Sequence, residues 1–427
     1  MLLQRFRHYF GLHYIFFLYC LVISGLLIGL LAGYDKKYTV YVVGLYALPL
    51  GLTYFVGSAL LQYFFRRQGV LPGDNYIRYI RQSATPQFVA NGLFLLITGV
   101  FVVHGVLLGG YPGFRAFSEF DYNTLVNLRK GVTEDVPPLF NYLYSFTIRG
   151  FIPFSLVFAY YHRRQRHLAA FFVLALLFAF NGMQKSHFLT FFLPLGLLLL
   201  CEKKYLQGLA FLITIPACIL LTVFITNPAL KYSVASRFIN VEHSLENHPE
   251  EQKALEEMNK ISVEEANQAA ASSIMERTVY LPGQMVGKWF EAIPRKKPFL
   301  HGQGYRIYAR CTGQPFHDYS TEMYSMLYPE YAQRGYSGSV NVASFMYDYA
   351  NFGLPGLLLS ACVMGLLLLL VNQTFAGDVP MKIAFNTMPV LMLSSTSFTT
   401  LLFSGGWGLL VILFVLLLKK EAGHEKN

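Results

Sequence analysis

Charged residues and cysteines are both scarce in this chain, and the shortage of charge is the more informative. Only 14% of the residues are charged, whereas 54% are hydrophobic. A water-soluble domain of this length buries a full core without so large an apolar excess. The first apolar run, 14–34, is too long for a signal peptide and has no small-residue cleavage site, so we expect it to be a membrane span.

The cysteines do not form a disulfide framework. Four of the five (Cys20, Cys201, Cys218 and Cys362) lie in or at the end of apolar runs, and only Cys311 lies in a long polar segment. No CxxC pair or His/Cys cluster is present, so we expect no structural zinc and no cofactor. The sequence also lacks a nucleophile elbow, a P-loop and an HExxH motif.

The sequence has instead a series of apolar runs near the length of a bilayer span. We predict an all-α polytopic membrane protein with about ten transmembrane helices. The predicted spans are 14–34, 38–63, 88–110, 141–161, 168–181, 187–200, 206–226, 341–371, 384–403 and 406–418.

Lysine and arginine gather in alternate loops between these spans. These loops and the two ends hold 15 of the 34 basic residues and only 5 of the 24 acidic ones, which accounts for the whole net charge of +10. The positive-inside rule then places both termini in the cytoplasm. Because the charge is spread over six separate pieces, it is poor evidence for nucleic-acid binding.

The opposite side holds two polar segments. We predict transmembrane helices 1–7 within residues 1–226, with a loop at 111–140. A large loop follows at 227–340, and helices 8–10 with the cytoplasmic tail occupy 341–427.

The large loop has an acidic middle. Residues 250–271 are rich in Glu, Lys and Ala, with apolar residues at helical spacing, which predicts an amphipathic helix from Pro249. The capping box at 262–265 predicts a second helix. A solvated acidic face fits the same pattern. No internal repeat is visible, which counts against an inverted-repeat transporter.

The fifth and sixth spans form a short hairpin. Its apolar arms, 168–180 and 188–200, have 13 residues each, about 20 Å against a hydrocarbon core of about 30 Å. The tip, with Lys185 and His187, is therefore expected below the membrane surface. Charges there face a cavity or a partner. The alternative is that Lys185 extends to the interface.

Two outer segments combine aromatic and basic residues. In the 111–140 loop, Arg115, Arg129 and Glu119 lie among aromatic residues, a composition that suits sugars and lipid phosphates and also an interfacial aromatic belt. From Arg277 to Arg306, a mixed helix and a basic, glycine-containing turn would make an anion cradle.

Four strings follow one another along the chain. They are Arg115 in the first large loop, Gly182-Met-Gln-Lys185-Ser at the hairpin tip, Arg277 with Trp289-Phe-Glu-Ala-Ile-Pro294 and Gly302-x-Gly-Tyr-Arg306, and Asn351-Phe-Gly-x-x-Gly356. In this order they resemble the Wzy-type O-antigen and oligosaccharide repeat-unit polymerases, over roughly residues 100–370, and the last string is similar to the turn that opens a long span in that family. O-antigen ligases, a related family, carry a His within the segment corresponding to 339–344, and none is here, which favours a polymerase.

The resemblance implies a GT-C-like membrane glycosyltransferase of the bacterial inner membrane, with the large loop in the periplasm. It would polymerise undecaprenyl-pyrophosphate-linked repeat units without a nucleotide sugar. A polysaccharide co-polymerase that regulates chain length is an implied partner. Chemically, the leaving pyrophosphate needs cations and the attacking hydroxyl needs a base.

The candidate residues follow from these two needs. The candidate catalytic residues are the cation Arg277 and the bases Asp348, Glu322 and His317, with Asp318 and Glu119 as further bases. The candidate substrate-binding residues are Arg115, Arg129, Lys185, Arg237, Arg306, Arg310, Trp289 and Tyr280. No metal is expected.

Three other functions stay open. A ligase-like transferase would move the glycan once, onto lipid A core or protein. A transporter or flippase would show repeat symmetry and polar residues in most spans. A non-catalytic export scaffold would use the large loop as a docking surface.

Overall fold

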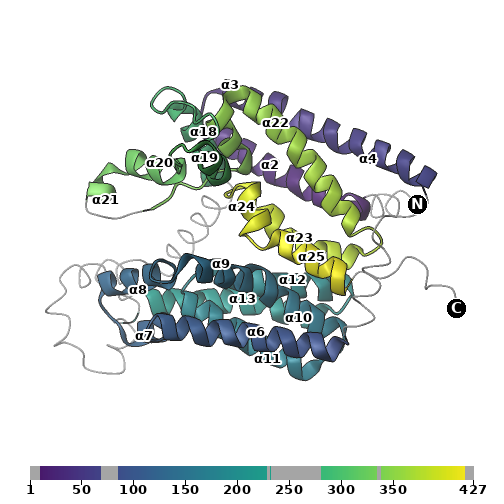
Figure 1. The fold of residues 1–427 in the computed structure, drawn as a ribbon, viewed down its shortest axis with the longest axis vertical. Coiled ribbons are helices and arrows are strands. Elements are labelled where there is room, and N and C mark those ends of the chain that lie inside the picture. The colour runs from purple at the N-terminus through teal and green to yellow at the C-terminus, as the bar shows by residue number, and fades with distance from the viewer. Residues whose placement is uncertain (1–9, 69–84, 228–230, 232–279, 334–337, 419–427) are drawn as a thin grey trace, which may run out of the picture. The chain divides into compact units, whose positions relative to one another are not determined.

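The computed structural model describes residues 10–68, 85–227, 231, 280–333 and 338–418. Every described element is a helix, which confirms the predicted all-α class (Figure 1). Eight helical segments in this part of the chain are long and apolar enough to cross a membrane. They are Tyr14–Gly33, Lys36–Leu61, Pro86–Leu107, Pro138–Tyr161, Gln165–Gly182, Tyr205–Thr226, Ser344–Thr374 and Phe398–Leu417.

Seven of these segments lie close to predicted spans, and the eighth, Phe398–Leu417, contains most of the predicted tenth span, 406–418. The predicted sixth and ninth spans differ from the structure. The predicted sixth span corresponds to α12 (Lys185–Cys201), an apolar helix of 17 residues, about 26 Å long. The predicted ninth span, 384–403, is not one helix: α23 (Val379–Met392) ends and α24 (Phe398–Phe403) begins within it. The polar run Ser394–Ser397 lies at this break. Its hydroxyl groups form hydrogen bonds with nearby backbone and side-chain groups, and such local bonds compete with the regular hydrogen bonds of a helix.

The helices divide into two compact units, which we describe separately. Unit 1 comprises residues 1–74, 271–382 and 389–402, and unit 2 comprises 75–270, 383–388 and 403–427. The further elements of unit 1 are α2 (Tyr14–Gly33), α3 (Lys36–Tyr41), η1 (Val42–Ala47), α4 (Leu48–Gln68), α18 (Leu281–Ala292), α19 (Arg306–Thr312), α20 (Tyr319–Leu327), α21 (Pro329–Gln333) and α22 (Ser344–Thr374).

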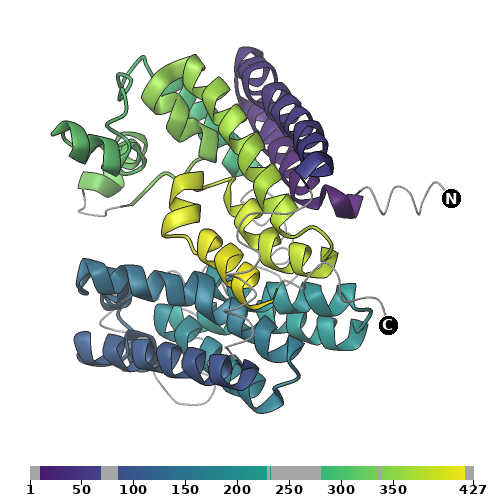
Figure 2. The same ribbon diagram turned by 45° about the vertical axis from the view of Figure 1, so that its right-hand side comes forward.

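Unit 1 packs segments that lie far apart in the sequence. Helix α22 lies against α2 and α4, as both ribbon views show (Figures 1 and 2). Helix α18 also packs on α2, and a glycine permits their close approach: a Cβ on Gly283 of α18 would lie 2.2 Å from the carbonyl oxygen of Leu26 in α2. Small residues at helix contacts are the usual means of packing helices closely in a membrane.

A kink in α22 fixes the loop that precedes α19. Gly353 has φ +68°, and Pro355 carries no N–H to bond to the carbonyl of Asn351 four residues earlier. The backbone N–H of His301 donates to that carbonyl instead, at 2.9 Å. The Asn351 side chain accepts bonds from the N–H groups of Gly302 and Gly304, at 3.1 and 3.0 Å. The loop therefore uses hydrogen-bonding capacity that the kink leaves open.

Unit 2 is a bundle built around the α11–α12 hairpin. Its arms are 18 and 17 residues long, longer than the predicted 13, because polar residues at the ends are also helical. The elements of unit 2 are α6 (Pro86–Leu107), α7 (Pro112–Ser118), α8 (Tyr122–Glu134), α9 (Pro138–Phe146), η2 (Thr147–Phe151), α10 (Ile152–Tyr161), α11 (Gln165–Gly182), α12, α13 (Tyr205–Thr226) and α25 (Trp407–Leu417).

A buried polar chain fixes the segment between α6 and α9 to this bundle. The Nε2 of His104 bonds to the carbonyl oxygen of Val132 at 3.0 Å, and its Nδ1 lies 3.3 Å from Nδ2 of Asn181. The Asn181 Oδ1 accepts from the backbone N–H of Gly113. These bonds join α6, α7, α8 and α11 and satisfy groups that would be costly to bury alone.

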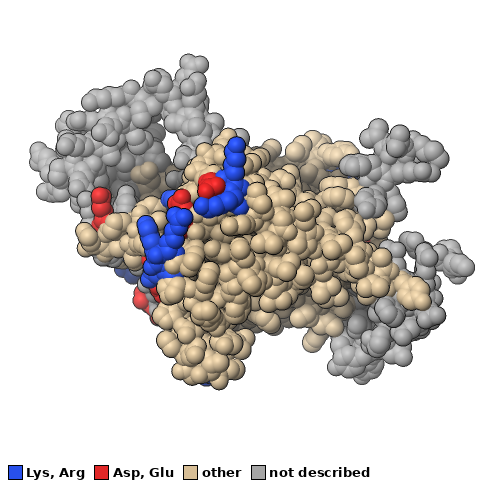
Figure 3. Space-filling view, turned by 90° about the horizontal axis from the view of Figure 1, so that it is seen from above, with Lys and Arg blue, Asp and Glu red and all other residues tan. Residues whose placement is uncertain are grey.

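Charge is unevenly distributed on the molecular surface. Figure 3 shows lysine and arginine side chains gathered, with acidic ones beside them, over one part of the face in view, whereas a wide area of that face carries no charge. Charged side chains avoid the hydrocarbon region of a bilayer, so this distribution supports a membrane-embedded protein.

The contact between α18 and α2 yields a matched test. Gly283→Ala places a methyl group against the Leu26 carbonyl, and we expect it to lower the free energy of unfolding by about 1–3 kcal/mol. Gly25→Ala is the control, because nothing lies within 4 Å of its added Cβ. Thermal unfolding in detergent compares the two. Equal melting temperatures for both variants would contradict the close approach.

Candidate functional site

Arg149 is a charged residue inside a membrane span. It lies on η2, within the apolar segment Pro138–Tyr161. The helix widens here: the N–H of Ile152 bonds to the carbonyl of Thr147, five residues back, and Pro153 supplies no N–H to the carbonyl of Arg149. Such wide turns are frequent at functional sites.

Arg149 has no carboxylate partner within the described part of the chain. Its backbone is fixed from the other side by the turn before α25, because a Cβ on Gly406 would lie 2.7 Å from the Arg149 carbonyl carbon. A charge in a span costs several kcal/mol unless something compensates it. An unpaired arginine held in place by its backbone is therefore a candidate anion site.

Two unpartnered polar atoms lie near this arginine. The His187 ring is buried, and its Nδ1 has no hydrogen-bond partner among the described residues; the same is true of the Tyr144 hydroxyl. Both atoms face Gly182, whose added Cβ would lie 2.8 Å from His187 Nδ1 and 3.5 Å from Tyr144 Oη. Arg149, and after it Arg129, acts electrostatically on the His187 ring.

We call Tyr144, Arg149, Gly182 and His187 the arginine site. Its parts come from η2, from α9 and from both arms of the α11–α12 hairpin. It offers one fixed cation and two neutral hydrogen-bonding groups, in a setting where water competes little. This combination can hold an anion such as a phosphate, because guanidinium groups match phosphate oxygens in a bidentate way.

A buried lysine of unit 2 holds the turn between α7, which carries Arg115, and α8, which carries Arg129. Lys231 donates through Nζ to the carbonyls of Ala116 and Glu119. Burial lowers the pKa of Lys231, and the charge of Glu119 opposes this shift. The Glu119 carboxylate accepts from the N–H groups of the next two residues, at 3.0 and 2.9 Å, so it supports the turn.

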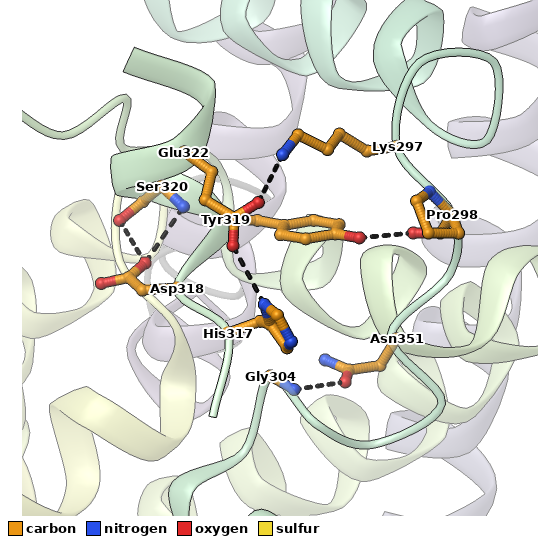
Figure 4. A network of polar contacts seen from close by, with 9 residues as sticks. All are labelled: Lys297, Pro298, Gly304, His317, Asp318, Tyr319, Ser320, Glu322 and Asn351. Carbon is orange, nitrogen blue, oxygen red and sulfur yellow. Dashed lines mark hydrogen bonds and ion pairs between the residues drawn. The ribbon is translucent and has the colours of Figure 1, made fainter. Parts of the chain in front are cut away.

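A second polar group lies in unit 1, outside the spans. Figure 4 shows Glu322 between Lys297 and His317: Oε2 lies 2.6 Å from the lysine Nζ, and Oε1 lies 3.1 Å from the histidine Nδ1. Tyr319 donates to the carbonyl of Pro298, and Asp318 caps α20 through Ser320. We call Lys297, His317 and Glu322 the Glu322 group.

The carboxylate of this group orients the histidine. Although burial opposes it, hydrogen bonds from Lys297 and His317 lower the pKa of Glu322. Both carboxylate oxygens are occupied, so Glu322 is a poor proton acceptor. A His317 ring that donates from Nδ1 leaves Nε2 as an acceptor, and no described residue bonds to it. This arrangement suits a histidine general base.

Asp348 lies in the first turns of α22 and is buried. Its Oδ1 accepts a hydrogen bond from the Tyr305 hydroxyl, and the Ser360 hydroxyl also acts on the carboxylate by hydrogen bonding. Burial and then the Asp348 carboxylate raise the pKa of Tyr305 well above its ordinary value. Asp348 therefore holds the loop before α19 through the Tyr305 hydroxyl.

The structure distributes the other predicted residues as follows. Arg277 and Arg237 lie outside the described residues, as do the helix predicted from Pro249 and the start of the second helix predicted at the 262–265 capping box. Trp289 is fully buried and packs on Tyr347, so its ring contacts protein. The exposed candidates are Arg115 on α7, Arg129 on α8, Lys185 at the start of α12, Tyr280 before α18, and Arg306 and Arg310 on α19.

Sequence reasoning missed Arg149, Tyr144 and Lys297 as site residues. A signal for Arg149 was present, because an arginine within a predicted span is a functional hypothesis by itself. The Tyr144 hydroxyl could not be identified, since only packing shows that it is unpartnered. Among the described residues, no group of three or more His, Cys, Asp or Glu could hold a metal.

Comparisons with protein-family models, with curated proteins and with solved structures find no match to this chain.

The unpartnered Tyr144 hydroxyl yields a prediction about stability. Tyr144→Phe removes a buried group that makes no hydrogen bond, so we expect unfolding stability to stay equal or rise by about 1 kcal/mol. Tyr46→Phe is the control, because its hydroxyl lies 2.6 Å from that of Tyr19 and its loss strands a buried partner. We expect this control to cost about 1–3 kcal/mol. Thermal unfolding of the ligand-free protein distinguishes them, and a destabilised Tyr144→Phe would show that the hydroxyl has a structural partner.

Proposed function

We propose that this protein is an integral-membrane glycosyltransferase that polymerises polyprenyl-pyrophosphate-linked oligosaccharide repeat units at the extracytoplasmic face. The observation that carries the proposal is the arginine site, where Arg149 lies within a span without a carboxylate partner among the described residues. A lipid-linked pyrophosphate is the kind of anion that reaches such a place, because its polyprenyl chain occupies the same bilayer.

The reaction transfers a glycan between two lipid-linked units. The bond between the anomeric carbon of the donor glycan and its pyrophosphate oxygen breaks. A bond forms between that carbon and a hydroxyl oxygen of the acceptor unit. The hydroxyl proton passes to a base, and the polyprenyl pyrophosphate leaves with the bonding electrons. The longer product remains linked to the acceptor's lipid.

The arginine site has properties that suit the leaving group of this reaction. Arg149 and the exposed Arg129 would stabilise the negative charge that develops on the leaving pyrophosphate. His187 and Tyr144 would bind its oxygens through hydrogen bonds. Within unit 1, Glu322 orients the ring of His317 and leaves Nε2 available, so His317 stays a predicted base. Arg277 stays a predicted catalytic cation through the family resemblance.

The remaining assignments complete the proposal. We assign the large loop to the periplasm, both termini to the cytoplasm, and the chain to a bacterial inner membrane. The undecaprenyl-pyrophosphate-linked glycan is the substrate, and a co-polymerase that regulates chain length is the proposed protein partner. These assignments rest on the distribution of charge and on the resemblance of four sequence strings.

A chain-length assay tests the proposal. Purified wild type and Arg149→Gln are incubated with lipid-linked repeat units, and products are resolved by chain length on a gel. We expect a ladder from the wild type and a loss of about 100-fold in rate for the variant, the scale for removing one charge-stabilising donor. Arg277→Ala is assayed in parallel. Arg166→Gln, which changes an exposed arginine in the first turn of α11, is the matched control and should keep the ladder.

The other outcomes assign other functions. A wild type that extends an acceptor only once is a ligase-like transferase. A wild type that binds lipid-linked units and leaves them unchanged is a transporter or scaffold. An Arg149→Gln variant with an unchanged ladder would remove the arginine site from the reaction.

A further inference from the structure

Helix α19 carries an apolar and basic surface that neither the fold nor the proposed reaction explains. Ile307 is 75% exposed, and the neighbouring Tyr308 and Phe316 are 44% and 39% exposed. Arg306 and Arg310 are also exposed, and neither forms an ion pair with a described carboxylate. Arg306 instead lies over the Phe316 ring, at 4.9 Å.

This surface lies beside the kink in α22. The loop before α19 is bonded to Ala350 and Asn351, and the ring of Tyr305 stacks on that of Phe352 with centroids 6.2 Å apart. Because α19 begins at the next residue, Arg306, its depth along α22 is fixed by these contacts.

The part of α22 that follows the kink has the length of a membrane span. Nineteen residues follow Pro355 in this helix, about 29 Å, which matches a hydrocarbon core of about 30 Å. Large apolar side chains of α22 are exposed from the kink onward, namely Phe352, Leu354, Leu358, Leu359, Val363, Leu366 and Leu370. Helix α19 therefore lies at one end of this apolar, span-length part of α22.

We propose that α19 is a membrane-surface anchor that binds anionic phospholipid headgroups of the outer leaflet. Ile307 and Phe316 contact the boundary between headgroups and acyl chains, and Tyr308 lies at headgroup level. Arg306 and Arg310, one helical turn apart, bind headgroup phosphates. Exposed apolar side chains beside unpaired arginines match a negatively charged interface, where each basic residue near the surface contributes about 1 kcal/mol.

The proposal differs from the sequence-based one for the same arginines. Arg306 and Arg310 were predicted to bind the substrate pyrophosphate. Their position on an exposed helix at bilayer level, next to Ile307, favours bulk phospholipid over a single bound substrate. The two ligands share phosphate chemistry, so the experiment has to separate them.

Cys311 supplies a reporter on the helix itself. It is exposed, whereas the other four cysteines are partly buried in or at the ends of apolar helices. The full-length protein is labelled with an environment-sensitive fluorophore, and Cys311→Ser defines the signal from the other cysteines. Labelled protein is reconstituted in phosphatidylcholine bilayers with or without about one third phosphatidylglycerol, and with headgroup-level nitroxide lipids as quenchers.

We expect quenching by the nitroxide lipids and a blue shift that is larger with phosphatidylglycerol. Arg306→Gln with Arg310→Gln should abolish the dependence on phosphatidylglycerol, and Ile307→Ser should weaken quenching in both bilayers. Arg295→Gln with Lys296→Gln, another exposed basic pair of unit 1, is the matched control and should change neither readout.

Two outcomes overturn the proposal. A fluorophore that stays water-exposed and unquenched in both bilayers shows that α19 does not touch the membrane. A shift that requires added lipid-linked glycan, and not phosphatidylglycerol, assigns the arginines to substrate binding. Neither readout uses turnover, so the result is independent of the polymerase assay.

Discussion

The cost of leaving a charge unpaired in a membrane is the constraint on which this structure depends most. Arg149 bears that cost within a span, on a widened helical turn held by Pro153 and by the approach of Gly406. His187 and Tyr144 add two unpartnered polar atoms beside it. A fold that only had to be stable would bury apolar side chains here. The arrangement supports the proposal that an anion from the bilayer binds at Arg149.

The rest of each unit supports local geometry of the same kind. In unit 2, the hydrogen bonds from Gly113 through Asn181 and His104 to Val132 fix the segment between α6 and α9, and so the position of Arg129. In unit 1, the kink in α22 leaves backbone groups open that the loop before α19 satisfies. Both units thus use polar groups at helix ends to hold loops that carry basic side chains.

Much of this architecture could be predicted from the sequence, because apolar runs and basic loops report directly on the bilayer. The helical class and seven spans follow from that pattern alone. The ends of the hairpin arms could not be predicted. A helix makes its own backbone hydrogen bonds whether its side chains are apolar or polar, so a change in hydropathy does not mark its end. The pairing of Asp348 with Tyr305 joins residues 43 apart in sequence, and the pairing of Glu322 with Lys297 joins residues 25 apart. Neither pair has a local signal. Arg149 did have one, but averaging hydropathy over a span conceals a single charge.

Direct binding of the leaving group tests the central claim most closely. Undecaprenyl pyrophosphate is added to purified wild type, Arg149→Gln and Arg166→Gln, and the bound fraction is measured by native mass spectrometry beside the monophosphate. The account predicts that wild type and Arg166→Gln prefer the pyrophosphate, and that Arg149→Gln binds it at least about tenfold more weakly, the equivalent of about 1.4 kcal/mol. Equal binding by all three proteins would contradict an anion site at Arg149.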